Sequence, residues 1–260
     1  MRGPATRRAT PIDVLISLFG ASTLELLSFG NEGWGPVLLL GLRNSLIIAV
    51  GAYGIGLLIG IAGAFGKLYG NPVVRDLLEV YTTVIRSVPE LVLVLLLYFA
   101  GTALVNQALE AFGYPPTDIN ALVAGIGVLG IVQGAYSTEV LRGAILSIPQ
   151  GQLEAARAYG MSPLVMLRRI TFPAMLPFAI PGLANLWLIA TKDTALLAVI
   201  GFGELTQATR QAAASTKAYF TFFVAAGCLY LAVTLLSNVV IARIERWARR
   251  GQPSLSGAGR

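Results

Sequence analysis

Five stretches of this 260-residue sequence are each long and apolar enough to cross a lipid bilayer as a helix. A helical span needs about 20 consecutive, mostly apolar residues. The stretches that meet this requirement are residues 37–65, 84–105, 119–141, 174–200 and 218–242. Because a chain inside hydrocarbon must satisfy its own backbone groups, such stretches form helices that pack in a bundle. The sequence therefore predicts an all-α integral membrane protein with five transmembrane helices.

The composition narrows the functional class. Charged residues make up 12% of the chain, against about 25% in a typical soluble domain. Histidine, the commonest general base and metal ligand, does not occur in the sequence, so we expect no enzyme activity, no metal and no cofactor in this chain. The net charge of +6 comes from basic residues in short loops and tails, a pattern typical of membrane topology rather than of nucleic-acid binding.

The basic residues are divided unevenly between the two ends of the predicted spans. Residues 106–118 contain no Lys or Arg, and the segment after the fourth span contains only Arg210 and Lys217. The segments after the first, third and fifth spans contain Lys67, Arg75, Arg142, Arg157, Arg168, Arg169, Arg243, Arg246, Arg249 and Arg250. The positive-inside rule places the richer segments in the cytoplasm, with the N-terminus outside and the C-terminus inside.

Residues 1–30 are expected to form an N-terminal extension ahead of a transmembrane domain that covers residues 31–247. Residues 12–29 are apolar but contain Asp13 and Glu25, which favours a helix lying in the membrane interface. Two alternatives stay open: a sixth span, which would place the N-terminus inside, and a signal-like segment. Residues 248–260 are predicted to be a disordered cytoplasmic tail.

Residues 147–173, between the third and fourth spans, are predicted to form a helical hairpin. Ser147 and Gln150 stand in the relation of a capping box, Pro149 falls in the first turn, and Gly160 suits the left-handed position after a helix. A second helix would begin with Ser162 as its cap and would end before Pro173.

One face of the first helix of this hairpin carries only small side chains. Ala155, Ala156 and Ala158 would let a partner approach the backbone closely, while Glu154 and Arg157 offer polar contacts. A short exposed helix of this kind suits docking into a groove. The alternative is that alanine is simply the best helix former, and spacing alone does not decide between the two.

Two glycine motifs do not indicate nucleotide binding. Residues 125–130, "GIGVLG", match GxGxxG, but no strand precedes them. Residues 63–70, "GAFGKLYG", lack both the first glycine and the Ser or Thr of a phosphate loop. We therefore expect this chain not to bind ATP itself.

Ionisable residues inside or beside spans are candidates for a substrate path, because they are costly in hydrocarbon. The candidates are Arg86, Glu90, Glu139, Lys192, Asp193 and Glu204. Glu139 and Arg142, three residues apart, favour a local ion pair. Lys192 and Asp193 would either form a buried pair or line the path.

Glu90 is the strongest of these candidates. Pro89 precedes it and is expected to break the helix, and interrupted helices are where transporter sites form. A carboxylate at such a break suits a cationic substrate. The alternative is that Glu90 pairs with Arg86 one turn earlier and only fixes the bend.

The residues Glu154, Ala155, Ala156, Gly160, Ile170 and Pro173 resemble the EAA loop of ABC-importer permeases. That loop has the pattern E-A-A, three residues, G, nine residues, I, one residue, L-P. One position departs from it, since Phe172 stands where the family has Leu. The resemblance implies a type I ABC importer permease fold in which these six residues couple the spans to an ATPase.

Four further stretches resemble the polar amino-acid branch of these permeases, similar to those for histidine, arginine, lysine, ornithine and opines. They are "YTTVIRSVPELVLVLLLYF", "GAYSTEVLRGAILSIPQGQLEAARAYGMS", "RRITFPAMLPFAIPGLANLW" and "KDTALLAVIGFGELTQATRQAAAST". The resemblance covers residues 37–247. Ser45 replaces a usual Thr, and Ser87 a usual Gly.

This resemblance implies a permease subunit in the bacterial cytoplasmic (inner) membrane that moves a basic or polar amino acid without catalysis of its own. It implies two cytoplasmic ATPase subunits that bind the ATP, an external substrate-binding protein, and a second permease subunit that forms a heterodimer with this chain. An alternative from the residues alone is a secondary transporter driven by an ion through Glu90, Asp193 and Glu204. No inverted repeat, which would support that alternative, is found in the sequence.

Overall fold

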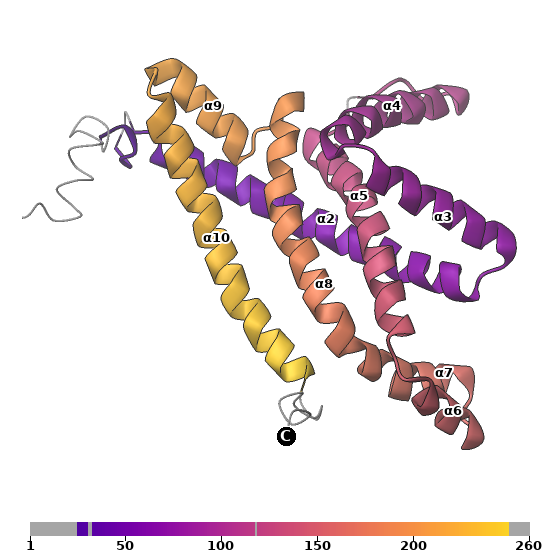
Figure 1. The fold of residues 1–260 in the computed structure, drawn as a ribbon. Helices are drawn as coiled ribbons and strands as arrows, with labels where there is room; N and C mark the ends of the chain where they lie inside the picture. The colour runs from indigo at the N-terminus through magenta and orange to yellow at the C-terminus, as the bar shows by residue number, and fades with distance from the viewer. Residues whose placement is uncertain (1–24, 31–32, 118, 250–260) are drawn as a thin grey trace, which may run out of the picture.

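The computed structural model describes residues 25–30, 33–117 and 119–249, and every secondary-structure element in these ranges is a helix (Figure 1). Residues 12–24 and 250–260 lie outside the described part of the chain. The predictions of an interfacial helix or sixth span near the N-terminus, and of a disordered tail, therefore stay predictions.

Five helical segments of the described chain are long and apolar enough to cross a membrane, as predicted. They are α2 (Gly35–Tyr69), α4 (Glu90–Ala111), α5 (Ala121–Leu146), the continuous run Pro163–Ile200, and α10 (Tyr219–Ala248). The run Pro163–Ile200 consists of α7 (Pro163–Met166), the π-helical turn η1 (Leu167–Thr171), α8 (Phe172–Asp193) and the 3-10 helix η2 (Thr194–Ile200).

The second span begins later than predicted. Residues 84–87 belong instead to α3 (Pro72–Ser87). The helix is interrupted at Val88 and Pro89, and α4 begins after them. Val88 is extended, with φ −96° and ψ 140°, because the proline ring disfavours helical geometry at the preceding residue. Pro89 is thus the breaker that the sequence indicated, but the break falls inside the predicted span.

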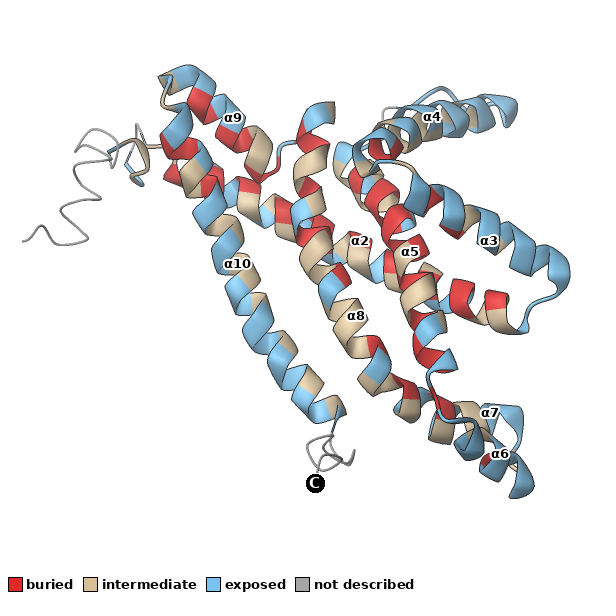
Figure 2. Cartoon of the chain, viewed as in Figure 1, coloured by how far each residue is buried: buried red, intermediate tan, exposed pale blue. Residues whose placement is uncertain are grey.

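The core forms where α2 crosses α5, and the red segments of Figure 2 gather along this crossing. A Cβ added at Gly56 would lie 2.6 Å from the Gln133 Cβ, and one at Gly60 would lie 2.4 Å from the Ser137 Cβ. Such close approach of two backbones is how helices pack without bulky side chains in lipid. Gly54, on the same helix, has no atom within 4 Å of an added Cβ and so takes no part in this crossing.

Helix α3 is amphipathic and is fastened to α5 by its buried face. The Tyr81 hydroxyl donates a hydrogen bond of 2.5 Å to the Ile131 carbonyl, and Ile85 packs in the same cluster as Val132. Burial raises the pKa of Tyr81 to about 12, so the hydroxyl keeps its proton and stays a donor.

Helix α9 (Leu205–Thr216) packs against the first turns of α2 and α10. Gly41 makes this contact possible, because a Cβ there would lie 2.9 Å from the Leu205 Cα. Leu38, Leu205 and Phe222 form the apolar centre of the contact. In Figure 1, α9 and α4 lie at one end of the molecule, and the α6–α7 hairpin and the C-terminal end of α10 at the other.

The helical hairpin forms, with two differences from the prediction. Its first helix, α6 (Gln150–Ala158), is preceded by Pro149 as N-cap, and the Ser147 hydroxyl donates to the Gly143 carbonyl 2.8 Å away. The capping box of Ser147 and Gln150 is therefore wrong, because Ser147 ends α5 instead of starting α6. Ser162 does precede a helix with Pro163 in its first turn, as predicted.

The second difference is that the helix does not end before Pro173. It widens into the π turn η1, and α8 then continues through Pro173 in its first turn. The amide of Phe172 bonds to the carbonyl of Leu167, five residues back. Proline in the first turn of a helix has no amide that the helix would need, so it is tolerated there.

Candidate functional site

The helical hairpin projects from the end of the bundle at which α10 also finishes (Figure 1). It is closed by a Schellman motif after α6. The Gly160 amide donates to the Arg157 carbonyl at 2.9 Å, and the Met161 amide to the Ala156 carbonyl at 3.1 Å. Gly160 has φ +69°, as predicted, and this left-handed conformation is the reason a glycine is needed there.

Four of the six residues of the EAA-like pattern, Gly160 among them, are exposed to solvent. Glu154, Ala155 and Pro173 lie on the surface, Ile170 is half-buried, and Ala156 is buried against the rest of the hairpin. Glu154 and Arg157 are both exposed, and no ion pair joins them in the described chain.

The tip of the hairpin presents apolar and basic side chains together. Tyr159 and Leu164 are 85% and 75% exposed. Leu164, Val165, Arg168 and Arg169 line a recess of about 390 Å³. Exposed apolar groups beside cations, on a helical support at one end of the bundle, form a surface suited to a protein partner.

A cluster of charged residues joins three helices near this end. The Lys67 ammonium of α2 lies 2.6 Å from Glu79 of α3 and 2.5 Å from Glu139 of α5, and it donates to the Thr82 hydroxyl oxygen at 2.9 Å. Glu139 also accepts from Arg142 at 2.9 Å, so the local pair predicted for these two residues is confirmed. We refer to Lys67, Glu79, Thr82, Glu139 and Arg142 as the Lys67 cluster.

The sequence predicts only one interaction of the Lys67 cluster, the ion pair of Glu139 and Arg142. Lys67 was interpreted as a loop residue that marks the cytoplasmic side, whereas its side chain is 3% exposed within the last turn of α2. The signal that α2 extends this far was weak, because the apolar stretch ends near residue 65.

Two acidic residues from different helices meet inside the bundle. Glu90 begins α4 and Asp193 ends α8, and the Glu90 carboxylate lies close enough to act electrostatically on Asp193 and on Tyr136 of α5. Gln133, one turn before Tyr136, donates to the Asp193 carboxylate at 3.3 Å. Two carboxylates in one low-dielectric place repel each other, which favours a cation bound between them.

On α5, the helix that supplies Gln133, two buried polar atoms are unused within the described chain. The Gln133 side-chain carbonyl oxygen and the Ser137 hydroxyl have no hydrogen-bond partner there. Buried polar atoms are nearly always bonded, so these two suit a ligand or ordered water. Sequence reasoning missed Gln133 and Tyr136, although polar side chains in the third apolar stretch were a usable signal.

Lys192 and Arg86, also predicted as candidates for the substrate path, form no ion pair with Glu90 or Asp193 in the described chain. Lys192 is exposed, and the described ion pairs join it neither to Asp193 nor to any other residue. Arg86 is exposed and forms no ion pair with Glu90 within the described ranges.

Glu204 is fully buried away from the carboxyl pair and holds α9 in place. It caps α9 by accepting from the amides of Thr206 and Gln207, each at 2.8 Å. Its carboxylate also accepts from the hydroxyls of Ser45 and Tyr230, each at 3.2 Å. Burial raises the pKa of Glu204 above its usual value, and these four hydrogen bonds oppose that shift.

This architecture defines a multi-pass membrane transport component: five apolar spans, a carboxyl pair inside them and a rigid hairpin beyond them. Residues 52–250 match the family described as binding-protein-dependent transport system inner membrane component. The chain belongs to this family of inner membrane permeases, whose transport depends on a binding protein.

Two curated relatives show how far the likeness extends. The chain is 39% identical to the nopaline transport system permease protein NocQ of Agrobacterium fabrum, over 88% of this chain and 98% of that protein. It is 40% identical to the histidine/lysine/arginine/ornithine transport system permease protein HisQ of Escherichia coli, over 82% of this chain and 94% of that protein.

Solved structures agree with this assignment. A crystal structure of an amino acid ABC transporter with histidines superposes with a TM-score of 0.70 and 30% identity, covering 82% of this chain and 95% of that one. The MetNI methionine ABC transporter in an inward-facing conformation superposes with a TM-score of 0.66 at 20% identity, which shows the common fold alone.

Proposed function

We propose that this chain is the permease subunit of an ABC importer that moves a basic amino acid or an opine across the inner membrane. The observation that carries the proposal is the identity of 39% and 40%, over more than four fifths of the chain, to permeases for nopaline and for histidine, lysine, arginine and ornithine. The carboxyl pair of Glu90 and Asp193 supports the choice of a cationic substrate.

The substrate path in this proposal runs beside the break between α3 and α4. Glu90 and Asp193 attract the positive group of the substrate, while the Gln133 carbonyl oxygen and the Ser137 hydroxyl offer it hydrogen bonds. Arg86, exposed one turn before the break, lies where it would meet a carboxylate of the substrate. Glu139 and Glu204 are left out of the path because they are engaged elsewhere, and Lys192 is left out because it is exposed and forms no ion pair within the described chain.

The orientation follows from the basic residues and from the shape of the molecule. The hairpin, with Arg157, Arg168 and Arg169, and the end of α10, with Arg243 and Arg246, lie at the same end. The positive-inside rule puts that end in the cytoplasm and α9 outside. With five spans, the N-terminus is then external and the C-terminus cytoplasmic.

The partners in the proposal are two cytoplasmic ATPase subunits, a second permease subunit in a heterodimer, and an external binding protein. The exposed face of α6 with Glu154 and Ala155, together with the apolar tip at Tyr159 and Leu164, is the surface on which an ATPase subunit docks. A transporter driven by an ion alone is set aside, because the family of this chain depends on a binding protein.

A co-purification experiment tests the proposal. The tagged chain is isolated in detergent from its native membrane, and substrate-stimulated ATP hydrolysis and uptake of radiolabelled arginine into vesicles are measured. We expect the wild type to retain an ATPase subunit and Glu154→Arg to lose it together with uptake. Asp76→Arg is the matched control, since it reverses an equally exposed carboxylate on α3, away from the hairpin.

Two outcomes would overturn the proposal. If neither the wild type nor Glu154→Arg retains an ATPase subunit, and uptake follows an ion gradient, the importer assignment fails. If the ATPase is retained but no basic amino acid or opine stimulates hydrolysis, the substrate class fails and the importer assignment stands.

A further inference from the structure

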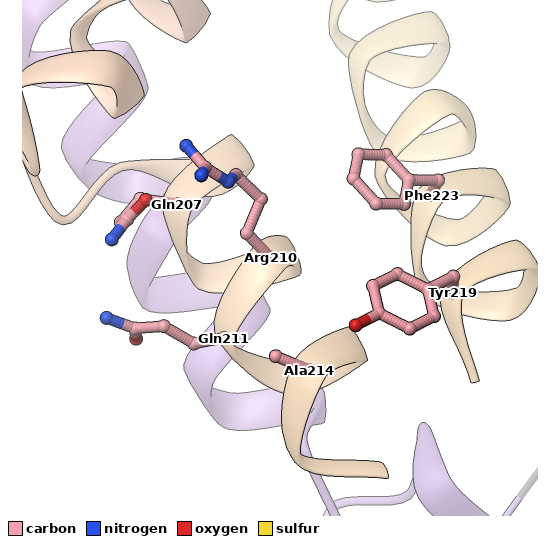
Figure 3. A pocket seen from close by; sticks show the side chains of 6 residues that line it. All are labelled: Gln207, Arg210, Gln211, Ala214, Tyr219 and Phe223. Carbon is pink, nitrogen blue, oxygen red and sulfur yellow. The ribbon is translucent and has the colours of Figure 1, made fainter. Parts of the chain in front are cut away.

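A recess opens between α9 and the first two turns of α10, far from the carboxyl pair. It measures about 470 Å³ and is lined by Gln207, Arg210, Gln211, Ala214, Tyr219 and Phe223. Figure 3 shows Tyr219 and Phe223 on α10 opposite Arg210 and Ala214 on α9, with the Tyr219 hydroxyl directed toward α9. Ala214 is small, so the space between Arg210 and Tyr219 stays open.

The recess supplies a positive charge and no negative one. Arg210 is the only charged residue of α9, it is exposed, and it forms no ion pair among the described residues. The nearby carboxylate of Glu204 is buried and already accepts from the amides of Thr206 and Gln207. A guanidinium has five donors in a planar fork, an arrangement that fits phosphate oxygens.

A second polar atom, on a residue that lines the recess, is also unused. The side-chain carbonyl oxygen of Gln207 is buried and has no hydrogen-bond partner within the described chain. Gln207 and Arg210 are three residues apart on α9, so their side chains lie on neighbouring positions of the helix surface. A ligand that fills the recess therefore needs an anion for Arg210 and a hydroxyl donor for Gln207.

The recess continues into an apolar surface. Helix α10 is the least buried of the five candidate spans, with 6% of its apolar window buried. Beyond Phe223, no atom lies within 4 Å of a Cβ added at Gly227, and Leu231 is 56% exposed. Tyr219 and Phe223 stand at the start of the span, where aromatic residues mark the membrane interface.

We propose that this recess binds the headgroup of an anionic phospholipid of the phosphatidylglycerol type. Arg210 binds the phosphate, assisted by the Tyr219 hydroxyl, and the buried Gln207 oxygen accepts from a glycerol hydroxyl. The acyl chains lie on α10 over Phe223 and Gly227. A carboxylate of a docking protein would satisfy Arg210 but would leave this apolar continuation unexplained. The inference goes beyond transport and does not depend on the substrate.

Thermal unfolding of the delipidated permease, purified with the subunits it assembles with, tests the site. We expect phosphatidylglycerol vesicles to raise the melting temperature of the wild type, and phosphatidylcholine vesicles to leave it unchanged. Arg210→Gln removes the charge and should weaken the apparent affinity for phosphatidylglycerol about tenfold. Tyr219→Phe should weaken it about threefold, because it loses one neutral hydrogen bond. Lys217→Gln is the control, since it removes an exposed charge that does not line the recess.

The proposal is overturned if both lipids raise the melting temperature of the wild type equally. It is also overturned if phosphatidylglycerol raises the melting temperature of Arg210→Gln as much as that of the wild type. If inorganic phosphate alone reproduces the shift, the site takes free phosphate and the lipid assignment fails. If a purified binding protein, and not the lipid, produces an Arg210-dependent shift, the recess is a protein-docking site instead.

Discussion

Lys67 of α2 and Glu139 of α5 form an ion pair of 2.5 Å although 72 residues separate them in the chain. With Glu79 and Thr82 of α3 as its other partners, the ammonium of Lys67 has all three donors engaged. The Lys67 cluster thereby holds the end of α2, the middle of α3 and the end of α5 at fixed spacing.

Replacing Lys67 with methionine should destabilise the permease by about 3 kcal/mol, because it leaves the partly buried Glu139 with Arg142 alone. Glu79 is 64% exposed and is expected to be hydrated after the change. The measurement is chemical unfolding in detergent. The double variant Lys67→Met/Glu139→Gln should lose less than the sum of the single variants. Strict additivity would show that the two groups do not interact.

The crossing of α2 and α5 should tolerate no side chain at Gly60. Gly60→Ala places a Cβ 2.4 Å from the Ser137 Cβ and 2.9 Å from the Ser137 carbonyl carbon, so the two backbones must separate. We expect a loss of about 1–3 kcal/mol, the usual cost of overpacking. Gly54→Ala, on the same helix with nothing within 4 Å, should cause no loss. Equal effects of the two changes in a melting experiment would contradict this account of the crossing.

Glu204 should matter for stability and not for substrate affinity. Glu204→Ala removes the cap of α9, worth about 1 kcal/mol, and leaves two hydroxyls, those of Ser45 and Tyr230, without this acceptor. We therefore expect a total loss of about 3 kcal/mol, since a buried group without a partner costs about 1–3 kcal/mol. Ser215→Ala, which loses only a bond within its own exposed turn, is the control. A raised KM with an unchanged melting temperature would assign Glu204 to the path instead.

The left-handed conformation at Gly160 gives a sharp test of the hairpin. Gly160→Val is strained at φ +69° even though an added Cβ meets no atom within 4 Å. We expect loss of ATPase retention and of uptake, while Gly160→Asn, which tolerates this conformation, should keep most of both. Full transport by the valine variant would mean that the geometry after α6 is not needed for coupling.

Neutralising the carboxyl pair should weaken binding of a cationic substrate. We expect Glu90→Gln or Asp193→Asn to raise the KM for uptake of a basic amino acid about tenfold, because each removes one charge-assisted bond. Glu110→Gln changes an exposed carboxylate of the same helix as Glu90 and should leave the KM unchanged. A lower kcat at unchanged KM would indicate that the pair positions helices and does not bind the substrate.

Local signals in the sequence predicted the features that depend on nearby residues. The apolar stretches indicated five spans, Pro89 marked the break before α4, and Gly160 marked the end of α6. The ion pair of Glu139 and Arg142 followed from a spacing of three on one helix.

Features that depend on which helices meet could not be obtained in this way. Nothing local shows that Lys67 reaches Glu139, or that Glu90 meets Asp193, because helix order in space fixes both contacts. Ser147 was misassigned for a related reason, since a serine between two helices suits the end of one as well as the start of the next. Glu204 is a candidate for the substrate path in the sequence, and its part as a buried cap is visible only once α9 packs against α2.

The unbroken run from Pro163 to Ile200 has a mechanical consequence. Its 38 residues contain a π turn and, after Pro163 at the start, three further prolines, Pro173, Pro177 and Pro181, but no loop, so the tip of the hairpin and the Asp193 carboxylate belong to one continuous helical run. At about 1.5 Å of rise per residue, Leu164 and Asp193 lie about 44 Å apart along the run, and a tilt of about 10° at one end displaces the other by about 8 Å. A force applied at Leu164 is thus transmitted toward Asp193 through helix alone, with the π turn and the internal prolines as the places where this helix can bend.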